Sequence, residues 1–486
     1  MPLRPMSREQ GWLLPPMLGD LVPLTHPARF VAEFVDGLKL EEWAALGVEV
    51  EGDPEGAPAY HPRALLGVWV YGFMTGVRSC RKLEGACRDQ VPYLWLTGWQ
   101  HPDHNTLWRF YQQHRGAMRR LLKKTVRTAV VMGLVDLAVQ AVDGTKISGS
   151  ASKQRTYNAK ELRGLLERTE AAIAQLEAQN EGGEGPPLPQ LPQEMTKAQT
   201  LRERVRAALL QLESEGEPEE VNLTDGDAKL MKTRHGFVAG YNAQAVVSPL
   251  DPEQAGRPGL FIMAAEVVTD AEDHGQLLPM VEAAQEGSGV SVAVTLADAG
   301  YHSGANLQTC ADQGRTIVMP ESGQESLKNP YHKQRFTYGT ESDDFTCPHG
   351  QKLLFRGVKK RLGELPVRVY RGNGVVCRAC PAFGTCTPNR QGRAIETGPY
   401  EAVLRQHRTW MATQDAKALY CQRKVLPEPT FGILKEQQGA RRFLLRGLPN
   451  VSAEWHLLAS AFNLRTLWKV WANQGSRQSW WAMARA

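Results

Sequence analysis

The feature that most constrains the fold is a short β-branched run, Leu137-Ala-Val-Gln-Ala-Val-Asp143-Gly-Thr-Lys-Ile147. Its alternating apolar residues predict a strand, and Gly144 predicts a turn directly after it. An Asp at the carboxyl end of a strand lies where ligands of α/β sheets collect. Asp143 alone is better explained as a polar turn residue. Its role therefore depends on whether the rest of the chain supplies partners.

The bulk composition indicates a globular protein of several domains. The chain has 486 residues, of which 42% are hydrophobic and 22% charged, enough for about two to four domains. Its net charge of +5 weakly favours a polyanionic partner. It shows no apolar run of ~18 residues and no secretory signal near its start, so we expect a cytoplasmic protein without a membrane span. Eight cysteines in a reducing compartment then indicate a metal or free thiols rather than disulfides.

Residues 1–135 predict a helical, DNA-binding N-terminal domain. Apolar residues recur at helical spacing over 62–78 and 106–132. The second stretch is strongly basic and could follow DNA phosphates, although a solvated helix face explains it equally well. Its cations are Arg109, Arg115, Arg119, Arg120, Lys123, Lys124 and Arg127, and a second basic cluster holds Arg78, Arg81, Lys82 and Arg88.

Residues 136–472 predict a catalytic domain built on a mixed α/β sheet. Strands are expected at 240–247, 260–268, 290–297 and 315–320, with a helix over 273–286. Two insertions interrupt this pattern. Residues 150–222 predict a helical hairpin, with helices over 158–180 and 196–214 joined by a Gly/Pro-rich loop, and residues 325–400 form a Cys-rich β insertion. A further helix is expected from Ser452 to about Trp471, followed by a loosely ordered tail over 473–486.

A second aspartate, Asp298, ends the apolar run at 290–297. If the two strands are neighbours, Asp143 and Asp298 converge, and two converging carboxylates need a cation. Hard oxygen ligands suit Mg²⁺ or Mn²⁺, and paired metals can clamp the attacking and leaving oxygens of a phosphoryl displacement. Glu428 is the best third carboxylate, because Lys435 lies two helical turns further on and can meet a phosphate. Glu428 is also explained as an acid at a helix N-terminus.

Other acidic residues are also candidates for the third metal ligand. Asp225 and Asp227 precede the strand at 240–247, in an Asp-Gly-Asp sequence that favours a polar turn. An acidic cluster at 270–274 is adequately explained by the start of the following helix.

Several motifs, in order along nearly the whole chain, resemble the DDE transposases of bacterial insertion sequences. The resemblance is to the IS1182-type group, related to the IS4 and IS5 families. The motifs are Trp12-Leu-Leu-Pro-Pro, Gly76-Val-Arg-Ser-Cys-Arg-Lys-Leu-Glu84, Pro102-Asp-His-Asn-Thr-Leu-Trp-Arg-Phe110, Asp143-Gly-Thr-Lys-Ile147, Thr224-Asp-Gly-Asp227, Leu296-Ala-Asp-Ala-Gly-Tyr301, Tyr420 to Lys435, Phe443-Leu-Leu-Arg-Gly447, and Glu454-Trp with Asn463-Leu-Arg465.

This resemblance implies an RNase H-like core in which Asp143, Asp298 and Glu428 hold Mg²⁺ or Mn²⁺. It implies cleavage at the ends of an insertion sequence and transfer of the freed 3′-OH to target DNA. The expected partners are double-stranded DNA, as terminal inverted repeats and target, and a second copy of the chain in a homodimer. A metal-dependent nuclease without strand joining, or a non-catalytic zinc- and DNA-binding derivative, would share most of these features.

The family signature Y-x2-R-x3-E-x6-K maps onto Tyr420, Arg423, Glu428 and Lys435, which would contact DNA around the metal site. Four residues, not three, separate Arg423 from Glu428, whereas Lys424 has the expected spacing. Either Arg423 or Lys424 is therefore the predicted phosphate contact, and Lys146, beside the first aspartate, is predicted to contact DNA as well.

The cysteine pattern predicts a structural zinc site. Cys377 and Cys380 form a C-x2-C pair, with Cys386 nearby and Cys347 thirty residues upstream. Four thiolates give a closed tetrahedral Zn²⁺ shell, with His349 as a substitute ligand. Unligated thiols in a β insertion are the alternative. The other cysteines, Cys80, Cys87, Cys310 and Cys421, are expected to be small buried apolar residues.

Overall fold

The computed structural model describes residues 17–50, 59–181, 191–214, 220–234, 236–321, 328–360 and 365–473. The chain divides into two compact units. The first comprises residues 1–272, 280–292 and 425–486, and the second comprises 273–279 and 293–424. The Trp12 motif, the Gly/Pro-rich loop of the hairpin (182–190) and the predicted tail beyond Asn473 lie outside the described residues.

The first unit begins with the predicted helices. These are α1 (Pro27–Asp36), α2 (Leu40–Leu46), α3 (Pro62–Thr75), α4 (Cys80–Asp89), α5 (Val91–Leu96), α6 (His104–His114) and α7 (Ala117–Val131), after a short 3-10 turn, η1 (Leu18–Leu21). Two predicted ranges are wrong in detail. The helix expected over 62–78 stops at Thr75, because Gly76 takes the left-handed conformation (φ 82°). The helix expected over 106–132 is two helices, with the break at the helix-destabilising Gly116.

The sheet of the first unit is organised around β5 (Gly236–Pro249). This strand pairs antiparallel with β1 (Val139–Ser148), β4 (Lys229–Thr233) and β6 (Leu260–Val268). The turn expected at Gly144 is wrong, since β1 runs straight through it to Ser148. Gly144 lies opposite Gln244 in the register, so the partner strand keeps this glycine extended. Asp143 is therefore a mid-strand residue, opposite Ala245, and not a strand-end residue.

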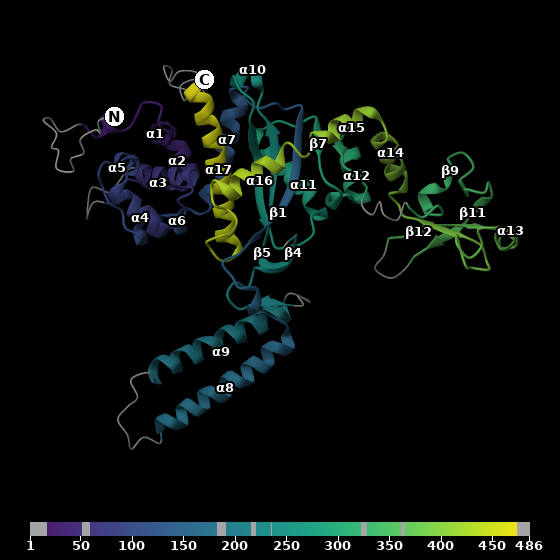
Figure 1. The fold of residues 1–486 in the computed structure, drawn as a ribbon, viewed down its shortest axis with the longest axis horizontal. Helices are drawn as coiled ribbons and strands as arrows, with labels where there is room; N and C mark the ends of the chain where they lie inside the picture. The colour runs from purple at the N-terminus through teal and green to yellow at the C-terminus, as the bar shows by residue number, and fades with distance from the viewer. Residues whose placement is uncertain are drawn as a thin grey trace, which may run out of the picture. The chain divides into compact units, whose positions relative to one another are not determined.

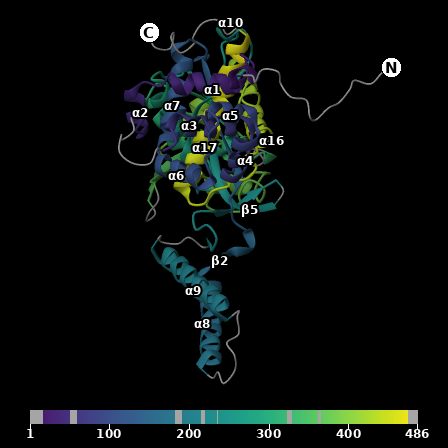
Figure 2. The same cartoon turned by 90° about the vertical axis from the view of Figure 1, so that its left-hand side faces the viewer.

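Two helices near the C-terminus pack on this sheet. The long α17 (Leu448–Asn473) lies against β6, α7 and α3, and its residues 453–464 are all buried. Figure 1 shows it, in yellow, beside α7, and in Figure 2 the N-terminal helices lie in front of it. It starts four residues before the predicted Ser452. The shorter α16 (Pro427–Glu436) packs on β1 and β5. The arrangement joins the N-terminal helices, the sheet and the C-terminal helices in one core.

The predicted helical hairpin is present as α8 (Ala159–Glu181) and α9 (Leu191–Ser214), which lie side by side in both views (Figures 1 and 2). At its base, after the turn η2 (Lys153–Arg155), β2 (Thr156–Tyr157) pairs with β3 (Val221–Asn222). A small cluster of Leu162, Val205, Ala208 and Val221 holds the hairpin together. The β5–β6 loop contains the short helix α10 (Pro252–Ala255).

The second unit contains a parallel strand pair and helices. It begins with η3 (His274–Gln276), and the helix that follows, α11 (Leu277–Ser288), belongs mostly to the first unit. In the second unit, β7 (Val294–Leu296) pairs in parallel with β8 (Thr316–Val318). Between them lie η4 (Ala299–Tyr301) and α12 (Gly304–Asp312), and α14 (Glu401–Met411) and α15 (Gln414–Cys421) follow later. The strand expected over 290–297 is too long. Its start is a turn instead, in which Gly289 has φ 78° and the Ser288 hydroxyl accepts the Val290 N–H at 3.2 Å.

The predicted Cys-rich insertion of the second unit is a separate five-stranded antiparallel sheet. Its order is β13 (Ala394–Thr397), β12 (Val367–Gly372), β11 (Lys352–Lys359), β10 (Asp344–Thr346) and β9 (Thr337–Gly339). The turn η6 (Lys333–Arg335) precedes it and α13 (Gly374–Ala379) follows β12. Its core has five buried residues, which are Phe336, Phe345, Leu353, Tyr370 and Ile395.

The structure confirms the predicted fold class, a mixed α/β, RNase H-like core with a helical N-terminal region. The order along the chain is three antiparallel strands, a helix, a strand, a helix and a strand, as the hydrophobic pattern predicts. No helix in the described ranges combines the length and apolar character needed to cross a membrane.

Candidate active site

Strand β1 displays the first aspartate on the face that α16 covers. Asp143, Thr145 and Ile147 share one face by strand alternation, and Ile147 is 1% exposed. Asp143 is half-buried, and its Oδ1 accepts the N–H of Gly144 at 2.9 Å. Lys146, a predicted DNA contact, belongs to the opposite face by the same alternation.

Helix α16 carries the predicted third carboxylate. Pro427 occupies its first turn, where a missing N–H costs nothing, and Glu428 follows in the same turn. Thr430, Phe431 and Leu434 bury the inner side of the helix, while Glu428 is exposed. An acid in the first turn is also favoured by the helix dipole. The helix thus offers Glu428 to the solvent from a well-anchored backbone.

Lys435 ties α16 to the strand of Asp143. Its Nζ donates to the Thr145 Oγ1 at 2.5 Å. Burial lowers the pKa of Lys435, as does the positive charge of Arg441, while the negative charge of Asp143 acts in the opposite direction. Beyond the helix, the Phe443 N–H donates to the Ser148 carbonyl at 2.9 Å. The first unit therefore brings the Asp143 strand and the Glu428 helix together.

The second unit positions Asp298 and Arg423 together. Asp298 follows β7 and caps η4, with its Oδ1 accepting the Gly300 N–H at 2.8 Å. The Arg423 Nη2 lies 3.4 Å from the Asp298 Oδ2, and the Arg423 side chain is only 11% exposed. Lys424 is exposed, and Tyr420 is half-buried on α15. Of the two candidate phosphate contacts, Arg423 is engaged by an aspartate and Lys424 faces solvent.

Two families match separate parts of the chain. A family described as Transposase DDE domain matches residues 346–468, and one described as Transposase domain (DUF772) matches residues 16–113. The chain belongs to the DDE transposases. The pairing of these two domains is typical of IS1182-type transposases. The DDE match includes Glu428 and Lys435 but not Asp143 or Asp298. No curated protein matches the chain.

The competing acids of this transposase have structural partners. Asp225 is 5% exposed and accepts the Tyr241 hydroxyl at 2.8 Å and the Gly447 N–H at 3.1 Å. Asp227 accepts the Leu448 N–H at 2.7 Å, at the first residue of α17. Both carboxylates therefore anchor the start of α17. This leaves Glu428 as the stronger candidate for the third acid.

The basic face of α7 has partners inside the transposase. Arg119 pairs with Glu266 at 2.8 Å, Lys123 pairs with Glu286 at 2.5 Å, and Lys124 pairs with Glu42. These ion pairs favour the structural interpretation of the helix. On α4, in contrast, Arg81 and Lys82 are exposed.

Sequence reasoning missed a buried ion pair behind the site. The Arg78 guanidinium donates to Glu454, to the Gly439 carbonyl and, at 2.9 Å, to the Arg442 carbonyl. Glu454 also accepts the N–H groups of Leu444 and Leu445 at 3.1 Å. The pair holds the segment that follows α16. Both residues stand in the family motifs, but 376 positions separate them, so no local pattern could reveal the contact.

The cysteines outside the Cys-rich segment differ in their solvent exposure. Cys87 and Cys310 are buried as expected, and burial raises the pKa of Cys87 to about 12 and that of Cys310 to about 11. Cys80 is half-buried. The expectation for Cys421 is wrong, because it ends α15 on the exposed side.

Proposed function

We propose that this transposase cuts DNA at the ends of its insertion sequence and joins the freed 3′-OH to target DNA. Asp143, Asp298 and Glu428 are the proposed metal ligands. The observation that carries the proposal is the bond from Lys435 to Thr145. It holds the helix of Glu428 on the strand of Asp143, in a chain whose C-terminal part matches the DDE domain.

The chemistry of these side chains suits Mg²⁺ or Mn²⁺. All three donors are carboxylates, which are hard oxygen ligands, and Asp143 and Glu428 keep solvent-accessible surface. Within the described residues, no group of three or more His, Cys, Asp or Glu side chains is already arranged to hold a metal ion. When bound, such ions lower the pKa of water and neutralise charge on a phosphate.

The remaining side chains have proposed roles that follow from their surroundings. Lys435 positions Thr145 and the Asp143 strand, and its ammonium offsets negative charge beside Asp143. Arg423 orients Asp298 through its contact at 3.4 Å. Lys424, which is exposed and correctly spaced from Glu428, contacts a DNA phosphate, with Tyr420 against the strand near the cut. Lys146 is not included, because alternation places it on the opposite face of β1.

In the first step, water attacks the phosphorus at the element end, the P–O3′ bond breaks, and the leaving oxygen takes up a proton. In the second step, this 3′-OH attacks a target phosphodiester and releases the target 3′-oxygen. Each step exchanges one P–O bond for another, so no external energy source is needed. The proposed roles of the acids and cations are orientation and charge neutralisation.

The N-terminal helices are proposed to bind the terminal inverted repeats. The exposed Arg81 and Lys82 on α4 supply cations that are suited to phosphates, and binding should weaken steeply with salt. Two ends must be joined to one target, so we propose a homodimer on DNA. Since the proposed substrate is bacterial DNA, we place the reaction in the cytoplasm.

The test uses a labelled element end, a target plasmid and Mg²⁺. We expect wild-type protein to yield both cleaved ends and joined products. Asp143→Asn, Asp298→Asn and Glu428→Gln should each abolish both. Glu436→Gln is the matched control on the same helix, since Glu436 is exposed and pairs with Arg441.

The same assay separates the alternatives. A pre-cut end that is never joined, although intact ends are cleaved, would replace transposition with a nuclease activity. Unchanged DNA binding with no metal-dependent product from wild-type protein would identify a non-catalytic derivative.

A further inference from the structure

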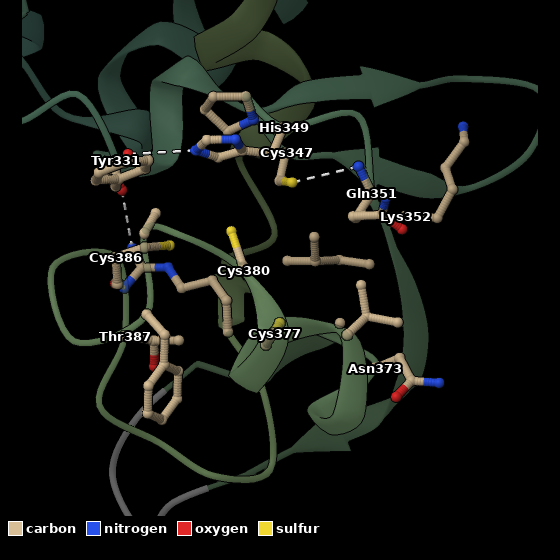
Figure 3. A pocket seen from close by; sticks show the side chains of 17 residues that line it. Tyr331, Cys347, His349, Gln351, Lys352, Asn373, Cys377, Cys380, Cys386 and Thr387 are labelled. Carbon is tan, nitrogen blue, oxygen red and sulfur yellow. Dashed lines mark hydrogen bonds between the residues drawn. The ribbon is translucent and has the colours of Figure 1, made fainter.

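The four cysteines of the Cys-rich segment gather around one cavity of about 50 Å³ in the second unit (Figure 3). They come from three different places in the chain. Cys347 follows β10, Cys377 and Cys380 lie on and directly after α13, and Cys386 lies in the loop that leads to β13. All four are half-buried and none is in a disulfide. Four cysteines around one cavity supply the ligand set of a Cys₄ structural zinc site.

The backbone around Cys347 forms a tight turn that holds its sulfur in place. The Cys347 carbonyl accepts the Gly350 N–H at 2.8 Å, and Gly350 has φ 76°, so the chain forms a tight turn. The Gln351 N–H donates to the Cys347 Sγ at 3.3 Å. This turn and its N–H donor fix the position of the Cys347 sulfur at the wall of the cavity.

The opposite wall leaves room for the Cys377 sulfur. A Cβ at Gly372 would lie 3.3 Å from the Cys377 Sγ, so the glycine permits this close approach. Arg393 also lines the cavity and donates to the Cys386 carbonyl at 3.2 Å. Its positive charge would offset part of the net negative charge of four thiolates around a divalent ion.

The small sheet requires stabilisation from a cross-link in addition to its hydrophobic core. Its core of five residues is too small to stabilise some seventy residues by hydrophobic burial alone. Cys347 and Cys386 pack directly against this core. A metal that joins β10, α13 and the loop after it would supply the missing stabilisation.

We propose that Cys347, Cys377, Cys380 and Cys386 bind one structural Zn²⁺, independently of the reaction proposed above. Zn–S bonds of about 2.3 Å require the sulfurs to lie about 3.8 Å apart. The described side chains are not yet so arranged, and rotation of the thiols toward the cavity closes the shell on binding. His349 is excluded from the set, because its ring stacks on Tyr331 and its Nε2 bonds the Tyr331 hydroxyl at 3.3 Å.

The test measures metal in the purified full-length protein. We expect one zinc per chain in the wild type, and we expect its loss in Cys380→Ser. Cys310→Ser is the matched control, since Cys310 is buried elsewhere in the same unit, and it should keep the metal. After zinc removal, added Co²⁺ should give the absorption of a tetrahedral cobalt–thiolate site in the wild type and not in Cys380→Ser.

Two further results keep the proposal falsifiable if Cys380→Ser does not fold. His349→Ala should retain zinc. Loss of zinc from His349→Ala, together with retention of zinc by Cys386→Ser, would overturn the proposed ligand set. Wild-type protein that contains no zinc, takes up no Co²⁺ and has all four thiols freely reactive would overturn the site itself.

Discussion

The buried pair of Arg78 and Glu454 gives the sharpest prediction about stability. Their side chains are 4% and 2% exposed, so water screens neither charge. Replacing Arg78 with Met removes three hydrogen bonds and leaves the Glu454 carboxylate with only the N–H groups of Leu444 and Leu445. Removing one partner of a buried pair costs about 3–5 kcal/mol. Arg78→Met should lower the free energy of unfolding of the first unit by that amount.

Urea unfolding can be followed by tryptophan fluorescence, to which Trp455, fully buried beside Glu454, contributes. The double variant Arg78→Met/Glu454→Gln should recover about 0.5–3 kcal/mol relative to the sum of the single variants, because no buried charge is left alone. Arg88→Met is the control, since the Arg88 side chain is 62% exposed and pairs with Glu84 on the same helix, α4. A loss below about 1 kcal/mol for Arg78→Met, or strict additivity in the cycle, would refute the buried-pair account.

Three further predictions concern the site and its supports. Lys435→Met should reduce DNA cleavage about a hundredfold. The urea midpoint should not fall, because the substitution removes a buried charge as well as a hydrogen bond. An unchanged cleavage rate would exclude Lys435 from the site. Gly300→Ala should reduce strand transfer about tenfold or more, since its Cβ would lie 2.9 Å from the Asp298 Oδ1, whereas Gly275→Ala, with no atom within 4 Å, should be neutral. Burial lowers the pKa of His407 below its ordinary 6.5, so the unfolded chain binds more protons and the second unit should lose stability as the pH falls below 6.5. Urea midpoints at pH 7.5 and 5.5 should differ less in His407→Gln, and an undiminished difference would count against this assignment.

Local patterns predict much of this fold, for reasons visible in particular elements. Alternation predicts β1, and the spacing of Glu428 and Lys435 places both on one helix, which the structure shows as α16. Gly144 is misleading, because a glycine in a short run usually ends a strand. Here β5 pairs with that glycine from a hundred residues away. Long-range pairing, which no local pattern contains, decides where β1 ends.

The sequence predicts the candidate residues of the site better than it predicts the contacts that these residues make. Nothing near Asp225 in the sequence indicates that Tyr241 and Gly447 occupy its oxygens, which weakens it as a metal ligand. The signature spacing leaves Arg423 and Lys424 equivalent, and only the contact with Asp298 distinguishes them. The role of each polar side chain depends on its tertiary partners, and those partners are distant in the chain.

Metal rescue at Asp143 is the direct test of whether this residue holds the catalytic metal. The measurement is strand transfer by Asp143→Cys, with a pre-cut end and a target plasmid, in Mg²⁺ and in Mn²⁺. A thiolate is a poor ligand for Mg²⁺ and a better one for the softer Mn²⁺. If Asp143 holds the catalytic metal, joining should be absent in Mg²⁺ and partly restored in Mn²⁺. Wild-type activity of the variant in Mg²⁺ would contradict the account.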